Sequence, residues 1–138
     1  MRQASGSLEI ATSGPCLHEI TRDVTHWVAA QRMVTGLLTL FCRHTSASLL
    51  IQENAAPEVK GDLVAFFARL APERGDYAHH DEGPDDMPAH LKSALTQVSL
   101  SIPVVGGRPG LGTWQGVYLF EHRRQPQRRT VLIHLVGD

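Results

Sequence analysis

The chain has 138 residues, of which 42% are hydrophobic and 20% charged, with a formal net charge of -1 at pH 7. A chain of this length can bury one hydrophobic core without disulfides, and its near-neutral charge argues against nucleic acid as the main partner, since phosphate binding normally requires a basic face. Its two cysteines are too few for a disulfide framework, and no apolar run reaches the length of a membrane span. We therefore expect one reduced cytoplasmic domain over residues 1–138, without a secretion signal or a membrane partner.

The first half of the chain alternates between strand and helix patterns. Apolar residues at helical spacing, such as Val24, Trp27 and Val28, predict a helix that begins at Thr21 and ends before Gly36. Pro57 suits the first turn of a second helix, over residues 57–70. The predicted strands are residues 7–12, 17–20, 36–43 and 46–52. The predicted buried stripe of the second helix is Val59, Leu63, Phe66, Phe67 and Leu70.

The second half opens with an acidic, irregular segment over residues 72–88 and continues with strands. A short helix is predicted over residues 88–96, with Leu91 and Leu95 pointing inward. Strands follow over residues 98–105, 113–121 and 130–136. The arginines between the last two strands are interpreted as a solvated hairpin tip; they are Arg123, Arg124, Arg128 and Arg129. The pattern predicts an α+β fold, mainly an antiparallel sheet or sandwich, with two or three helices.

A first group of candidate site residues follows the strand at residues 36–43. His44 ends this strand, and the hydroxyls of Thr45, Ser46 and Ser48 come directly after it. Hydroxyls and free backbone N–H groups at a strand end can hold a phosphate or another oxyanion. The alternative is a turn in which the same hydroxyls bond only to the backbone.

A second group lies in and after the acidic segment. His79 stands in the segment and His90 at the start of the short helix, with several carboxylates between them. Neutral imidazole is a common metal ligand, and nearby carboxylates often accept hydrogen bonds from metal-bound imidazoles. The spacing matches no standard zinc motif, so a merely solvated acidic loop is the alternative.

Two further features are interpreted as structural. The glycine-rich run over residues 106–112 is neither a Walker loop nor a dinucleotide fingerprint, because it lacks the Gly-Lys-Ser/Thr sequence and precedes a strand, so a flexible hairpin is expected. Cys42 lies in mid-strand among Leu and Phe, where a buried, unreactive thiol is expected. His18, His26, His122 and His134 are treated as background.

Three motifs occur in order: HTSASLLIQEN at residues 44–54, YAHHDEGPDDMPAHLKSAL at 77–95 and SLSIPVVGGRPGLGTWQGVYLFEHR at 99–123. Together they resemble the YjbQ-like family, also described as secondary thiamine-phosphate synthase, over nearly the whole chain. The resemblance implies a compact α+β fold and a homotrimer. It also implies that His44, His79 and His90 gather in one pocket, as three imidazoles with an open fourth position for a divalent metal, with Zn the expected ion.

The resemblance further implies a substrate site around these histidines and an activity for it. Gln115 is expected to orient the substrate as a fourth catalytic residue. The activity implied is weak thiamine phosphate synthesis, which joins a pyrimidine diphosphate to a thiazole phosphate and expels pyrophosphate. The leading hypothesis is a metal- and phosphate-binding enzyme, in which Ser46, Ser48 and the loop over residues 106–112 hold the anion. The alternatives are a trimer that binds a phosphorylated metabolite without catalysis and a purely structural trimer. The expected substrate-binding residues are Thr45, Ser46, Ser48, Glu53, Asn54, Asp86, Gly112 and Thr113.

Overall fold

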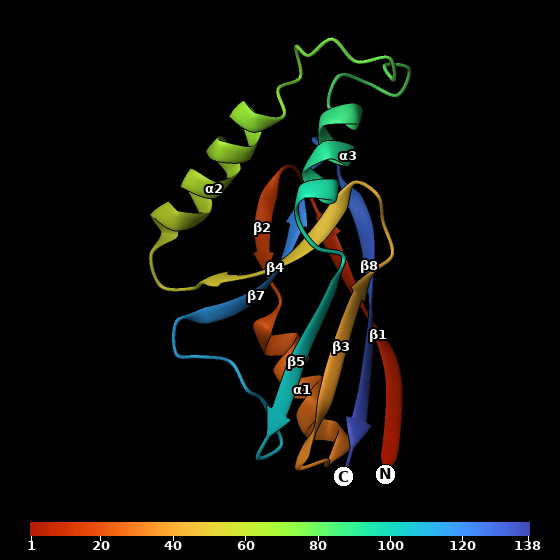
Figure 1. Ribbon diagram of the computed structural model, residues 1–138, viewed down its shortest axis with the longest axis vertical. Coiled ribbons are helices and arrows are strands. Elements are labelled where there is room, and N and C mark those ends of the chain that lie inside the picture. Colours follow the sequence, from red (N-terminus) through yellow and green to blue (C-terminus); the bar gives the residue numbers. More distant parts are fainter.

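Four long strands and one short one build the larger of two antiparallel sheets in the computed structural model, which describes residues 1–138 (Figure 1). Along each long strand the side chains alternate between the core and the outer face, so that Leu38, Leu40 and Cys42 are buried while Leu37 and Phe41 are exposed. The strand order is β1 (Arg2–Thr12), β8 (Gln127–Gly137), β3 (Thr35–Cys42), β5 (Ser99–Val105) and β6 (Arg108–Pro109).

The smaller sheet has three strands, ordered β2 (Cys16–Glu19), β7 (Gln115–Glu121) and β4 (Ala47–Glu53). Its inner face and helix α1 (Thr21–Gln31) pack against the inner face of the larger sheet around a single main core. Val24 and Val28 of α1 are fully buried there, as the helical periodicity predicts. The two chain ends lie side by side in Figure 1, where the Met1 amino group is 2.7 Å from the Asp138 carboxylate.

Helix α2 (Pro57–Leu70) covers the outer face of the smaller sheet and has the predicted bounds. Its predicted stripe is only partly covered: Leu63 and Phe67 pack against the sheet, but Phe66 is 48% and Leu70 53% exposed. The prediction of a buried stripe was therefore wrong for these two residues, because the three-stranded sheet covers one narrow side of the helix. None of the three helices is long and apolar enough to cross a membrane.

Helix α3 (Asp86–Leu95) begins two residues before the predicted start and packs beside β4. The residues that it buries are Asp86, Pro88, Ala89 and Ser93. Leu95 is 59% exposed, so the prediction that it points inward was wrong. The mainly antiparallel α+β class is confirmed, and α3 carries two of the candidate site residues at the top of the molecule in Figure 1.

Candidate metal centre

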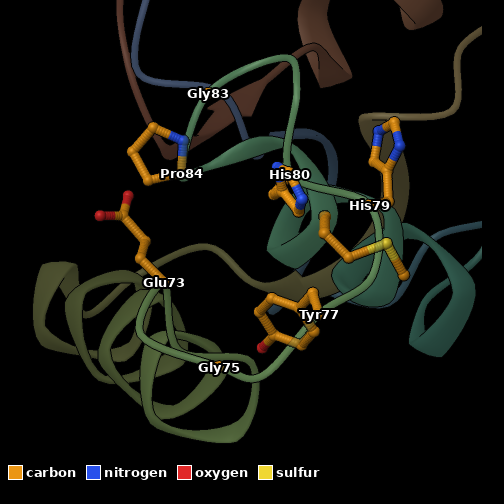
Figure 2. Close-up of a pocket in the computed structure, with 8 residues that line it drawn as sticks. Glu73, Gly75, Tyr77, His79, His80, Gly83 and Pro84 are labelled. Atoms are coloured by element: carbon orange, nitrogen blue, oxygen red, sulfur yellow. The ribbon is translucent and has the colours of Figure 1, made fainter.

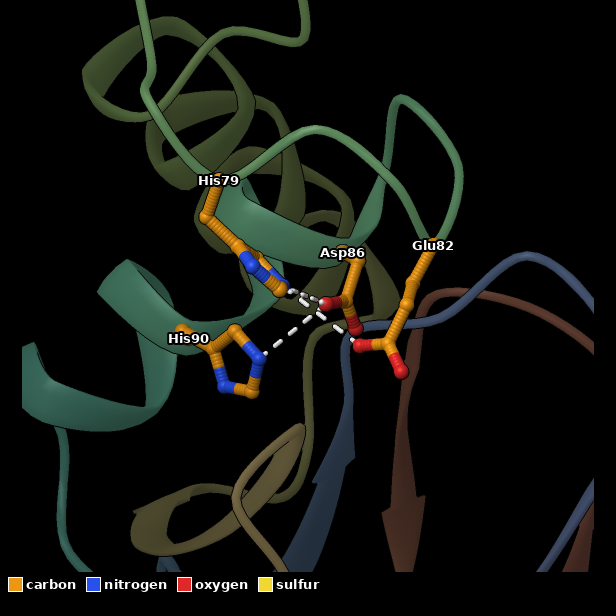
Figure 3. A group of neighbouring side chains, drawn as sticks. All are labelled: His79, Glu82, Asp86 and His90. Carbon is orange, nitrogen blue, oxygen red and sulfur yellow. Dashed lines mark hydrogen bonds and ion pairs between the residues drawn. The ribbon is translucent and has the colours of Figure 1, made fainter.

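Four side chains from α3 and the segment before it converge on one point (Figure 3). They are His79, Glu82, Asp86 and His90, and each offers one ligand atom within 4.8 Å of the other three. Two imidazole nitrogens and two carboxylate oxygens form a donor set that suits zinc and other divalent transition metals. The structure thus brings together two of the three predicted metal ligands, His79 and His90.

The spacing of the donor atoms fits a metal site. The Nε2 atoms of His79 and His90 lie 2.7 and 3.1 Å from the same oxygen, Oδ2 of Asp86. Glu82 Oε2 lies 3.4 Å from His79 Nε2. Zinc bonds of about 2.0–2.1 Å in a tetrahedron place neighbouring ligand atoms about 3.3 Å apart. The three separations of 2.7, 3.1 and 3.4 Å bracket that value.

Local structure explains why these atoms meet. Asp86 and His90 are four residues apart on α3, so they lie on the same face of the helix. His90 Nδ1 donates to the Thr45 carbonyl over 3.0 Å, which turns its Nε2 toward the cluster. Gly83 has a φ of 100°, which L side chains rarely adopt, and so lets the chain turn between Glu82 and α3.

Hydrogen bonds and neighbouring charges shift the pKa values of Asp86 and His79 toward their charged forms. Burial by itself would raise the pKa of Asp86, but the hydrogen bond from His79 and the neighbouring charges of His90 and Arg123 outweigh it and hold that pKa below its ordinary value. The hydrogen bond to Asp86 in turn raises the pKa of His79. Asp86 is 3% exposed, and it is therefore an ionised carboxylate held inside the protein by its partners.

His44 lies next to the cluster but outside the group of four. Its Nε2 accepts a hydrogen bond from the Thr130 backbone N–H over 2.8 Å, and burial lowers its pKa. Together with Thr45 and His90 it lines an open hollow of about 490 Å³, whose other walls include Ser93 and Thr96. His90 thus stands between the hollow and the donor cluster, while His44 faces the hollow.

The serines after His44 bond within the protein. Ser46 is 9% exposed, and its Oγ accepts a hydrogen bond from Arg129 over 2.9 Å. Ser48 is fully buried, and its Oγ lies 2.9 Å from Nε2 of His122 and 2.6 Å from Oγ1 of Thr96. Of the three predicted hydroxyls, only Thr45 lines the hollow.

A separate group of predicted residues lies at the other end of β4 and β7. The register pairs Ala47 with Glu121 near His44, and Glu53 with Gln115 at the far end of the same two strands. There Gln115 Oε1 accepts from the Gly112 N–H over 2.8 Å, and Asn54 donates to the Gln115 carbonyl. Within one chain, the structure therefore separates the predicted residues Glu53, Asn54, Gly112, Thr113 and Gln115 from the histidines.

The arginine-rich segment is not simply a solvated tip. Arg129 is 4% exposed and bonds Glu121, which is fully buried, with a closest distance of 2.6 Å. Arg123 reaches back to the segment before α3 and bonds Asp86 Oδ1 over 2.6 Å. The prediction was wrong for these two arginines because their carboxylate partners are distant in the sequence or buried, whereas Arg124 and Arg128 are exposed.

A second hollow, of about 290 Å³, lies beside His79 on the segment that joins α2 to α3 (Figure 2). Tyr77 lines it and donates its hydroxyl to the Pro72 carbonyl over 2.7 Å. His80 also lines it, but its ring pairs with Asp81 and takes no part in the group of four. The two adjacent histidines therefore have different surroundings, and only His79 belongs to the cluster.

The sequence reasoning missed two features of the site. It treated Asp86 as a substrate contact and gave Glu82 no ligand role, yet both carboxylates belong to the cluster. The Asp86-x3-His90 spacing on a predicted helix is the signal that could have revealed the first. No local signal distinguishes Glu82 from the other acidic residues of its segment.

Comparisons with known proteins agree with the fold. A family model described as "UPF0047 protein YjbQ-like" matches residues 6–138. A UPF0047 protein of Synechocystis is 54% identical over 138 residues, which cover 99% of this chain and 94% of the relative. The YjbQ protein of Escherichia coli O157:H7 is 41% identical over 133 residues, covering 96% of each.

Solved structures show the same likeness. A crystal structure of a hypothetical protein from Aeropyrum pernix superposes with a TM-score of 0.89 at 33% identity, covering 98% of this chain and 99% of that one. A conserved hypothetical protein from Thermus thermophilus gives a TM-score of 0.84 at 40% identity, covering 95% and 99% of the two chains. The likeness extends over nearly the whole length in both sequence and fold.

Proposed function

The chain belongs to the UPF0047 YjbQ-like family, and we propose that within it this protein is a metal-dependent enzyme acting on a small phosphorylated metabolite. The observation that carries the proposal is the group of four donor atoms from His79, Glu82, Asp86 and His90, which lie within 4.8 Å of one another. A divalent metal, with zinc the expected ion, would supply a Lewis acid that polarises a phosphate oxygen or activates a water.

The residues around the cluster support a substrate site beside it. His90 has one ring nitrogen at the cluster and the other on the Thr45 carbonyl, at the wall of the open hollow. His44 and Thr45 line that hollow and offer an imidazole and a hydroxyl to a substrate. We therefore assign His44 to substrate contact, with Asp86 and Glu82 completing the ligands in its place.

The metal assignment is tested by elemental analysis of purified variants. His79→Ala and His90→Ala should each abolish metal uptake, because each removes one of two nitrogen donors, while circular dichroism stays that of the wild type. His80→Ala is the matched control, since His80 is adjacent but pairs with Asp81. His44→Ala should also retain the metal. Unchanged metal content in both the His79 and His90 variants would refute the site.

Turnover is tested separately from binding. Thiamine phosphate formation is measured for the wild type and for His79→Ala, from the pyrimidine diphosphate and the thiazole phosphate. An equal rate in both would exclude this site from that reaction. A thermal-shift screen of phosphorylated metabolites, with and without zinc, then identifies ligands. Stabilisation with no product after long incubation would favour the alternative, a metabolite-binding protein without catalysis.

We further propose that the protein is a homotrimer that associates through the outer face of the larger sheet. Leu37 and Phe41 of β3 are each 44% exposed there, and Leu132 of β8, paired with Phe41, is 39% exposed. In Figure 1 the long strands carry no helix on this face, since α1 lies behind them. Large apolar side chains exposed on one face of a sheet are typical of a subunit interface.

A further inference from the structure

A single arginine fastens the segment that supplies two of the four donor side chains. Arg123, which follows β7 by two residues, donates from Nη2 to the Glu82 carbonyl over 3.0 Å and from Nε to Asp85 Oδ2 over 3.1 Å. Its Nη1 donates to Asp86 Oδ1 over 2.6 Å. The planar guanidinium fixes the directions of these three bonds together, which a lysine ammonium cannot do.

The two oxygens of Asp86 consequently have separate tasks. Oδ2 faces His79 and His90, at the point where the donor atoms converge. Oδ1 faces Arg123. The Asp86 side chain is only 4% exposed, so it has little room to turn and present both oxygens to one ion. As long as Arg123 holds Oδ1, Asp86 can offer a bound cation only its other oxygen, Oδ2.

The number of oxygens offered matters for which cation binds. Calcium takes about six to eight oxygen ligands and often uses both oxygens of a carboxylate, whereas zinc is satisfied by about four nitrogen and oxygen ligands. The guanidinium charge also repels every divalent cation. That repulsion acts on all ions of equal charge alike, so it changes affinity more than preference.

We propose that Arg123 is a specificity-determining residue of the metal centre, which restricts Asp86 to one coordinating oxygen. It thereby favours Zn²⁺, which needs few ligands, over Ca²⁺ and Mn²⁺, which prefer about six or more oxygen-rich ligands. The inference rests on the proposed metal site. Arg123 itself contacts no ion: it acts by positioning Asp86 and the segment from Glu82 to Asp86. Its signature is a change in the ratio of affinities, not merely in affinity.

The test measures Zn²⁺, Mn²⁺ and Ca²⁺ binding by competition titration on the full chain. In Arg123→Met the preference for Zn²⁺ over Ca²⁺ and Mn²⁺ should fall by roughly 10- to 100-fold, the range over which residues behind the ligands tune metal affinity. Arg123→Lys keeps the charge but loses the fork of donors, and its preference should also fall. The visible spectrum of bound Co²⁺ should change from an intense four-coordinate pattern to the weak absorption of higher coordination.

Arg124→Met is the matched control, because the Arg124 guanidinium pairs with Glu73 and makes no contact with the cluster. It should keep the wild-type preference and spectrum. If Arg123→Met changes the affinity for all three ions by the same factor, in either direction, and Arg123→Lys retains the wild-type ratio, Arg123 does not determine specificity and the proposal is overturned. A wild-type protein that binds no ion refutes the metal site itself, and the specificity role with it.

Discussion

His122 is a buried imidazole with one satisfied nitrogen. It is 1% exposed, its Nε2 lies 2.9 Å from Ser48 Oγ, and its Nδ1 has no hydrogen-bond partner in the protein. Burial lowers the pKa of this histidine to about 3. The folded protein therefore keeps His122 neutral at pH values where an unfolded chain would protonate it.

This difference gives a pH-dependent prediction. An unfolded histidine takes up a proton near pH 6.5, so between that pH and about 3 the unfolded state binds more protons and stability falls as the pH falls. From pH 7.5 to 4.5 the wild type should lose roughly 2–3 kcal/mol more free energy of unfolding than His122→Gln. Urea denaturation of both proteins at each pH measures this difference in the free energy of unfolding.

The comparison needs a control for general acid sensitivity. His26→Gln, which changes an exposed side chain of α1, serves as that control. Other titrating groups contribute equally to wild type and variants, so only the difference in slope is assigned to His122. Parallel pH profiles for the wild type and His122→Gln would show that His122 does not cause the acid sensitivity.

At the scale of elements, β3 and β8 approach so closely at one point that only a glycine fits. A Cβ added to Gly36 would lie 2.5 Å from the Val136 carbonyl oxygen, a backbone atom that cannot turn away. On α2, by contrast, a Cβ added to Gly61 would meet nothing within 4 Å. Replacing glycine by alanine should therefore change the free energy of unfolding in opposite directions at the two positions.

Gly36→Ala should lower the free energy of unfolding by roughly 1–3 kcal/mol, because the two strands must separate to admit the methyl group. Gly61→Ala should raise it by about 0.5–1 kcal/mol, since alanine favours an exposed helix more than glycine does. Urea denaturation of both variants beside the wild type measures the changes. A Gly36→Ala variant at least as stable as the wild type would contradict the close approach seen at Gly36.

At the scale of the whole molecule, the exposed face of the larger sheet is the proposed trimer interface. If this face forms the trimer interface, Phe41→Glu should give a monomer, because it introduces a charge at an apolar contact. Light scattering after size-exclusion chromatography measures the mass over a range of concentrations. Leu70→Glu, an equivalent change on the exposed side of α2, should remain trimeric. A monomeric wild type at every concentration would refute the interface.

The sequence alone determined most of the elements. Alternating apolar residues predict the long strands and their inward faces, as at Leu38 and Leu40, because the period of two is a local property of the chain. The helix from Pro57 to Leu70 also has the predicted bounds, because the residues that start and stop a helix lie next to its two ends in the sequence. The ordered motifs led to the correct family.

Only the tertiary structure decided which side chains meet. Arg123 and Asp86 are 37 residues apart, and Thr45 and His90 are 45 apart, so no local pattern predicts either contact. The exposure of Leu70 likewise depends on the width of the sheet beneath α2. The sequence predicted a site of three histidines, but in the fold two histidines and two carboxylates converge. Hydrogen bonds between distant segments set the directions of these side chains.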